Sequence, residues 1–292
     1  MLVACLSLKF THEFQGQDTG LERKSGAELA MKYRLDDLTS AEFKAMQPGN
    51  PVILLPMGSM EDQGAHAPMG DFRLASMMAQ LIASAASSVG TLCLAAPVIP
   101  FGAADHFASV PGAIALRPST LGLVLAEMIQ SLLDHQLTRL IVLNGHGGNG
   151  PVISEVTRRV RREGGPIIAS FPLWRVAERA MARRIGSAPG RFGHGGEPLA
   201  SIGMALRSGM MRPDLAVTPA PPGSLLGLKV TDFGTLGFED MPIDAPVDYD
   251  QVAPNSARGD ATKADAALGL AVVAEIVAIA ARFCLHVAAT QS

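Results

Sequence analysis

The sequence lacks a surplus of positive charge. Its 24 lysines and arginines are outnumbered by 27 aspartates and glutamates, which gives a formal net charge of −3. A protein that neutralises several phosphates needs a basic surface. We therefore expect no nucleic-acid partner for this chain.

Cysteine is equally scarce. The three cysteines, Cys5, Cys93 and Cys284, are odd in number and show no C-x-x-C spacing. Disulfide frameworks and dithiol redox motifs depend on paired or closely spaced cysteines. We predict reduced thiols in a cytoplasmic protein without redox chemistry.

The chain also lacks an unbroken hydrophobic run of membrane-spanning length. Residues 1–8 are apolar but too short for a signal-peptide core, so residues 1–32 are interpreted as a poorly ordered N-terminal extension. Residues 268–285 are interrupted by Glu275 and Arg282, whereas a membrane helix needs about 20 predominantly apolar residues. We predict a core helix there, and no membrane partner.

What the sequence does contain is an alternation of strand and helix patterns. Apolar residues make up 48% of the chain, enough for a large core. Unbroken apolar runs of strand length are typical of parallel strands that are covered on both faces. The pattern predicts a single α/β domain over residues 33–288, with a mostly parallel sheet flanked by helices. The expected strands are 52–57, 92–99, 140–143 and 167–171, and the expected helices between them are 74–85, 121–133 and 152–162.

Residues 213–254 depart from this alternation. They are rich in proline, glycine and aspartate and show little periodicity, which predicts a long irregular segment. Such segments in compact domains usually serve function or assembly. This one is also more apolar than a solvated loop should be. We therefore predict that the chain forms a homo-oligomer. The apolar residues of this segment on which the prediction is based are Leu225, Leu226, Leu228, Phe233, Leu236 and Phe238.

Three polar clusters stand out: two directly follow apolar runs of strand length, and the third precedes a helical pattern. Residues 58–71 gather three carboxylates and one imidazole between chain breakers that force a loop. Residues 144–151 place one histidine among glycines, and residues 193–198 repeat that arrangement beside a glutamate. The side chains of interest are Glu61, Asp62, His66 and Asp71 in the first cluster, His146 and Asn149 in the second, and His194 and Glu197 in the third.

Simpler roles suit some of these residues. Asp62 is expected to be a solvated loop charge, His106 taken alone would more often be structural, and Asn149 can cap the following helix. Mixed carboxylate and imidazole ligands from separate strand ends, however, suit a divalent cation such as zinc or manganese. The candidate ligands are Glu61, Asp71, His146 and Glu197.

Competing catalytic motifs are missing. The second cluster matches neither G-x-G-x-x-G nor G-x-x-x-x-G-K-[ST], and the chain has no G-x-S-x-G nucleophile motif. This disfavours a nucleotide loop and a serine nucleophile.

The order of these clusters resembles the creatininase (creatinine amidohydrolase) family. Residues 55–68 are similar to its L-P-x-G-S-x-E-x-x-G-x-H-x-P signature, and residues 144–149 match N-G-H-G-G-N. Residues 101–112, 194–201 and 259–261 resemble further family segments in the right order. The resemblance extends over roughly residues 33–285.

The resemblance implies an α/β fold with one or two divalent metals and hydrolysis of an amide-type C–N bond in a small-molecule substrate, often by a hexamer. The family's ligand positions fall on Glu61, Gln63, Asp71 and His146, with Glu197 as the candidate for a further ligand. His194 or Glu197 would act as general acid and base. His106, Gly147, Gly148 and Asn149 would line the substrate loop, and backbone N–H groups of the glycines could stabilise an oxyanion.

The chain departs from the family pattern at two ligand positions. Gln63 stands where the family has a histidine, and Asp71 lies five residues after His66 where six is usual. An amide oxygen is a poorer zinc ligand than an imidazole. We therefore predict one tightly held metal and a second position that is weak or empty unless Glu197 completes it, with His66 supporting the ligands.

Two other functions stay open at this point. One is hydrolytic ring opening of a cyclic keto-sugar or inositol derivative on the same metal site. The other is a non-catalytic metal-binding protein. The retained His194 and Glu197 argue against the latter, because a purely structural metal site needs no open coordination position.

Overall fold

The central element is a four-stranded parallel sheet with the order β2-β1-β3-β4. The computed structural model describes residues 32–187 and 190–290, so the expected extension over residues 1–32 lies almost wholly outside the described part. The chain divides into Met1–Lys32 and one compact unit from Tyr33 onward. The strands are β1 (Val52–Met57), β2 (Cys93–Ala95), β3 (Leu140–Asn144) and β4 (Ala169–Pro172).

Strand β1 lies at the centre of the core. All six of its residues are buried, as its unbroken apolar sequence predicts. It pairs in parallel with β2 on one side and β3 on the other. The strand expected at 92–99 is wrong in length, because β2 ends at Ala95. Beyond it, Ile99 forms one isolated β-bridge with Met57.

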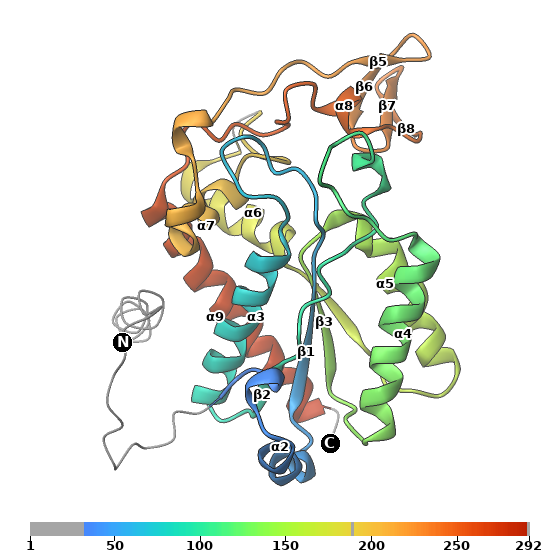
Figure 1. Ribbon diagram of the computed structural model, residues 1–292, viewed down its shortest axis with the longest axis vertical. Helices are drawn as coiled ribbons and strands as arrows, with labels where there is room; N and C mark the ends of the chain where they lie inside the picture. Colours follow the sequence, from blue (N-terminus) through green and yellow to red (C-terminus); the bar gives the residue numbers. More distant parts are fainter. Residues whose placement is uncertain (1–31, 188–189, 291–292) are drawn as a thin grey trace. The chain divides into compact units, whose positions relative to one another are not determined.

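Helices cover both faces of this sheet (Figure 1). The helices expected at 74–85, 121–133 and 152–162 are all present. Helices α4 (Pro118–Asp134) and α5 (Gly150–Arg162) pack together on one face. On the other face lie α3 (Phe72–Ser88) and the long α9 (Ala266–Thr290), with α6 (Leu173–Ile185) and α7 (Leu199–Leu206) packed against α9. The N-terminal α2 (Ser40–Met46) begins with a capping box between Thr39 and Glu42.

Helix α9 forms the predicted core helix. By length and composition alone it is apolar enough to cross a membrane, and it is the one such helix within the described residues. It is packed inside the fold, however: a Cβ on its Gly269 would lie 1.9 Å from the carbonyl oxygen of Ser201 in α7. Its Glu275 also forms ion pairs with Arg183 and Arg184 of α6. These contacts favour a core helix.

The segment 213–254 is not irregular, so that prediction is wrong. It contains an antiparallel sheet of β5 (Ser224–Leu225), β6 (Leu228–Asp232), β7 (Thr235–Phe238) and β8 (Met241–Asp244), followed by α8 (Tyr249–Val252). The strands are two to five residues long, too short to give a visible alternation. Val230 and Leu236 are buried in a small core of this sheet, which accounts for much of the segment's apolar character.

Short 3-10 helices occupy several connections. They are η1 (Leu35–Asp37), η2 (Gln47–Gly49), η3 (Asp105–Phe107), η4 (Gly147–Asn149), η5 (Ser208–Met210) and η6 (Pro213–Leu215). Two of them, η3 and η4, follow β2 and β3 along the chain and carry residues that line the site described next.

The parallel strands end at the same level. Met57 at the end of β1 pairs with Asn144 at the end of β3, and Asn144 pairs with Pro172 at the end of β4. The residues that follow these three strands therefore emerge side by side at one edge of the sheet. This register explains why polar residues far apart in sequence meet there.

Candidate metal centre

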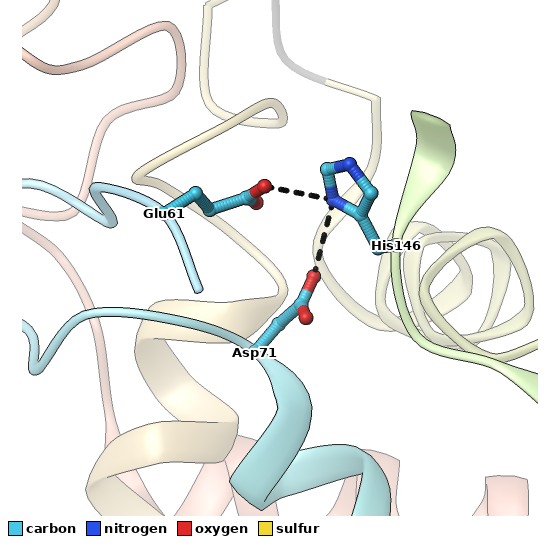
Figure 2. Close-up of side chains that lie close together, drawn as sticks. All are labelled: Glu61, Asp71 and His146. Carbon is cyan, nitrogen blue, oxygen red and sulfur yellow. Dashed lines mark ion pairs between the residues drawn. The ribbon is translucent and has the colours of Figure 1, made fainter. Parts of the chain in front are cut away.

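Three predicted ligands meet at this edge of the sheet (Figure 2). Glu61 follows β1, His146 follows β3, and Asp71 lies directly before α3. Each offers a ligand atom, and these atoms lie within 4.8 Å of one another. All three side chains are buried.

The distances within the cluster converge on the His146 imidazole. Its Nδ1 lies 2.9 Å from Glu61 Oε2 and 3.6 Å from Asp71 Oδ2. The contact with Glu61 misses hydrogen-bond geometry, so that buried oxygen has no hydrogen-bond partner. A buried carboxylate oxygen without a partner is costly, and a cation bound between the three groups would satisfy it.

The loop conformations that build the cluster depend on close backbone approaches. A Cβ on Gly58 would lie 2.7 Å from Asp71 Oδ1 and 2.3 Å from the Cα of Phe72, so only glycine fits after β1. Asp71 Oδ1 accepts a hydrogen bond from the Ser59 backbone N–H at 2.7 Å. That bond leaves the other carboxylate oxygen of Asp71 facing His146.

The electrostatics of the cluster suit a divalent cation. Burial and the charge of Glu61 raise the pKa of Asp71 to about 6. Burial opposes protonation of His146, but the two carboxylates outweigh it and raise its pKa to about 10. A proton on His146 thus balances the two acids when no cation is bound. A metal ion would displace that proton, because metal ligands must be deprotonated.

The far side of the His146 ring is also held. Its Nε2 lies 3.3 Å from the backbone oxygen of Ala103, in the usual arrangement where a metal-ligating histidine donates its second N–H to a carbonyl.

Asn149 was predicted to cap α5, but its side chain makes no capping hydrogen bond. Its amide instead accepts from the N–H of Ala103 and donates to the oxygen of Gly58, and so joins the loops that follow β1 and β2.

Glu197 does not join the ligand cluster, contrary to its predicted role as a metal ligand. Its carboxylate accepts hydrogen bonds from the hydroxyl and backbone N–H of Ser201 at 2.6 and 3.2 Å, and lies 3.8 Å from Arg191. It is fully buried, and burial raises its pKa. The cause of the difference is local: Glu197 precedes α7, whose first turn satisfies the carboxylate.

Gln63 and His66 occupy different positions relative to the cluster. The Gln63 amide nitrogen donates to Glu61 Oε1 at 2.9 Å, so this side chain helps to position a candidate ligand. His66 is buried away from the cluster, in a smaller cavity that Gln63 also lines, and its Nδ1 has no hydrogen-bond partner. The two residues share a loop, but only Gln63 contacts a ligand residue.

His194 faces the cluster from the third motif. Its Nδ1 lies 3.9 Å from Glu61 Oε1, and its Nε2 lies 2.5 Å from the backbone oxygen of Asp62. Since a carbonyl only accepts, Nε2 carries the proton and Nδ1 presents a lone pair toward Glu61. Burial lowers the pKa of His194, which favours this neutral form.

An aromatic cluster encloses His194, and sequence reasoning missed it. The ring centroids of Phe107, Tyr249 and Phe233 lie 5.0, 5.3 and 5.8 Å from the centroid of the imidazole. Tyr249 also donates its hydroxyl hydrogen bond to Asp62 Oδ2 at 3.0 Å. Asp62 is therefore a partner of the α8 segment, not the solvated charge that we expected.

A cavity of about 440 Å³ opens above the three ligands. This volume lies in the usual range for small-molecule sites. His106, Gly147 and Gly148 line it together with Glu197 and His194, whereas Asn149 and His66 do not. That the first three contact a substrate stays a prediction. Lining residues that were not predicted include Phe107, Trp174, Arg175, Glu178 and Phe233.

Comparison with known proteins gives a consistent result. The family model described as creatininase, creatinine amidohydrolase, matches residues 36–284. The mycofactocin precursor peptide peptidase of Mycobacterium ulcerans (strain Agy99) is 34% identical over 119 residues, which cover 39% of this chain and 47% of that protein. The chain spans about half the length of the curated relatives it matches.

Solved structures share the fold. A structure described as "Creatininase Mn" and one of a creatininase mutant of "Zn-Zn type" match with TM-scores of 0.69 and 0.68, each at 22% identity, covering 87% of this chain and 98% of theirs. At this identity the likeness shows the fold alone. Those neighbours are metal-bound forms by their descriptions.

Proposed function

The chain belongs to the creatininase family, and we propose that it is a metal-dependent hydrolase that cleaves the C–N bond of an amide. The observation that carries this proposal is the convergence of Glu61, Asp71 and His146 on one point beneath a cavity. The proposed substrate is a small molecule with a cyclic amide or formamide group. The peptidase relative extends the same bond type to peptides.

Glu61, Asp71 and His146 would hold one divalent ion, zinc or manganese. Two carboxylates and one imidazole suit either ion. When bound, such an ion lowers the pKa of a water molecule toward neutrality and polarises a carbonyl oxygen. A second ion would be held weakly, as expected from Gln63 in place of a histidine, because the amide of Gln63 is bonded to Glu61 and the carboxylate of Glu197 is bonded to Ser201.

His194 is the proposed general base and acid. Its Nδ1 lone pair faces the ligand cluster, so it can accept a proton from the attacking water and return it to the leaving nitrogen. Its Nε2–H bond to Asp62 and the ring contact with Phe107 hold the imidazole in this orientation. Glu197 lines the cavity but is bonded to Ser201, and we assign it a supporting role for the loop.

Backbone groups would assist the developing oxyanion. Gly147 and Gly148 lie directly after His146, at the start of η4 and α5, where N–H groups lack intrahelical partners. A Cβ on Gly148 would lie 2.1 Å from the oxygen of Ala103, so no larger residue fits at this approach. Gly148 thus packs closely against Ala103 and also lines the cavity, which supports its backbone N–H as a candidate oxyanion donor.

A hydrolysis assay tests the proposal. Protein stripped of metal and then reloaded with Mn²⁺ or Zn²⁺ should hydrolyse members of a panel of cyclic amides, formamides and short peptides, and the stripped protein should not. A cyclic amide should give one ring-opened product, whereas a formamide or a peptide should release a separate amine. Conversion of a cyclic polyol ketone with no amide cleavage would favour the alternative ring opening. Bound metal without turnover of any probe would favour the non-catalytic protein and contradict the proposal.

We also propose that the chain forms a homo-oligomer in the cytoplasm. Leu225, Leu228, Phe233 and Leu236 turn inward within the small antiparallel sheet, but Leu226, Phe238, Met241 and Ile243 expose 45–90% of their surface. The free, buried thiols of Cys93 and Cys284 suit a reducing compartment. Light scattering should give a mass several times 30.5 kDa, up to that of a hexamer, and a monomer mass would contradict the oligomer.

A further inference from the structure

The wall of the cavity formed by α6 carries charges that the proposed reaction does not use. Arg175 and Glu178 both line the cavity from this helix and both are exposed. Arg175 follows Pro172 by three residues, and Pro172 is paired with Asn144, two residues before His146. The first turn of α6 therefore rises next to the loop that carries a metal ligand.

Trp174 fixes this turn in place. Its indole N–H donates a hydrogen bond to the backbone oxygen of Gly145, the residue before His146. The guanidinium of Arg175 is thus attached to a segment that is anchored beside the reaction site. An anchored helix holds a binding group more accurately than a loop does.

The charge of Arg175 is not balanced within the described residues. Arg183 and Arg184 of the same helix pair with Glu275, but no ion pair joins Arg175 to Glu178 or to another described carboxylate. Among the described residues that line the cavity, it is the one lysine or arginine. It also stands in the first turn of a 13-residue helix, where unpaired N–H groups favour an anion.

The floor of the cavity would not repel such an anion once the site is loaded. A divalent cation offsets the two negative charges of Glu61 and Asp71, and Glu197 is bonded to Ser201 and lies near Arg191. The planar guanidinium can bind a carboxylate through two parallel hydrogen bonds. Among the described residues of the lining, Arg175 and Glu178 are the charged groups that remain unpaired, and of these two only Arg175 can bind an anionic group of the substrate.

We infer that Arg175 determines specificity by binding a carboxylate of the substrate, so that the substrate class is an amide that also carries a free carboxylate near the scissile bond. This inference rests on the proposed function, because it names the substrate of the same site. It adds a residue and a charge requirement that the ligand cluster alone does not specify.

Matched acid and carboxamide probes test this inference. N-acetylglycine, N-acetyl-β-alanine and N-acetyl-γ-aminobutyrate differ in the spacing between amide and carboxylate, and each has a neutral carboxamide counterpart. Calorimetry on the metal-loaded full chain should show that at least one acid binds about 10-fold or more tightly than its carboxamide, as expected for hydrogen bonds to a charged group.

Variants assign the preference to its residue. Arg175→Gln should abolish the preference for the acid, and Arg175→Lys should retain part of it, because lysine keeps the charge but not the two-pronged geometry. The matched control is Arg179→Gln, an exposed arginine on α6 that does not line the cavity, which should leave the preference unchanged.

The outcomes separate this inference from the proposed function. An acid preference that depends on Arg175 would support the inference, whatever the metal-loaded protein hydrolyses. Failure to hydrolyse any member of the panel of cyclic amides, formamides and short peptides would contradict the hydrolase. Hydrolysis of the probes with equal binding of acids and carboxamides would support the hydrolase and overturn the inference. A preference that persists in Arg175→Gln would also overturn it.

Discussion

Replacing His146 with alanine should remove the metal from the purified protein and abolish hydrolysis. The change deletes the nitrogen that faces both carboxylates, at 2.9 Å from Glu61 and 3.6 Å from Asp71. Loss of groups that merely support a ligand costs about 10- to 100-fold in metal affinity or activity, so loss of a ligand should weaken binding by more than about 100-fold. Elemental analysis after dialysis gives the metal content directly.

Two comparisons make this result specific. His135→Ala removes an exposed histidine at the end of α4 and should retain the full metal content. Glu61→Gln keeps the shape of the second ligand but removes its charge, so it should lose metal as His146→Ala does. Circular dichroism should show that Glu61→Gln and His146→Ala keep the secondary structure. A His146→Ala protein that is folded and holds its metal would refute the ligand assignment.

Replacing His194 with alanine should lower kcat by about 10²- to 10⁴-fold, the usual contribution of a general acid or base. The metal content should not change, because His194 lies outside the cluster of Glu61, Asp71 and His146. KM should also change little, since the ring moves a proton and is not assigned to hold the substrate. Steady-state kinetics together with metal analysis separates these quantities.

His194→Gln refines that test. Glutamine can still donate a hydrogen bond toward the Asp62 carbonyl, which His194 Nε2 approaches at 2.5 Å, yet it cannot accept and return a proton at neutral pH. Both variants should therefore be slow. Loss of metal in His194→Ala would instead identify His194 as a ligand, and an unchanged kcat would exclude it as the acid and base.

Much of the fold could be predicted from the sequence because its signals are local. The run from Val52 to Met57 is apolar without alternation, and only a strand covered on both faces accommodates it. The helical periodicities of α3, α4 and α5 are equally direct. The antiparallel sheet at 224–244 escaped notice because each strand has two to five residues and its pairing depends on tertiary contacts.

The ligand cluster was predictable for a different reason. Glu61 and His146 follow strands whose ends share a register, and parallel strands bring such residues to one edge. The same rule applied to β4 would have drawn attention to Trp174 and Arg175. Phe233 and Tyr249 gave no comparable signal, because they reach the site from the distant β6–β7 turn and α8.

Glu197 shows the limit of motif reasoning. Its position in the third motif matched that of a ligand, but a hydroxyl one helical turn along, on Ser201, binds its carboxylate at 2.6 Å. Gln63 was singled out as a departure from the family pattern, and its amide nitrogen donates to Glu61. The sequence shows that these side chains are polar, whereas their partners depend on local geometry.

We propose that one divalent ion binds between Glu61, Asp71 and His146, and that the described residues hold no second site of equal affinity. Titration of Mn²⁺ or Zn²⁺ into the metal-free protein, followed by calorimetry, tests it most directly. We expect one tight equivalent per chain, with any further binding much weaker, because the amide of Gln63 is bonded to Glu61 and the carboxylate of Glu197 to Ser201. Two equivalents of matched high affinity, or no tight binding at all, would contradict it.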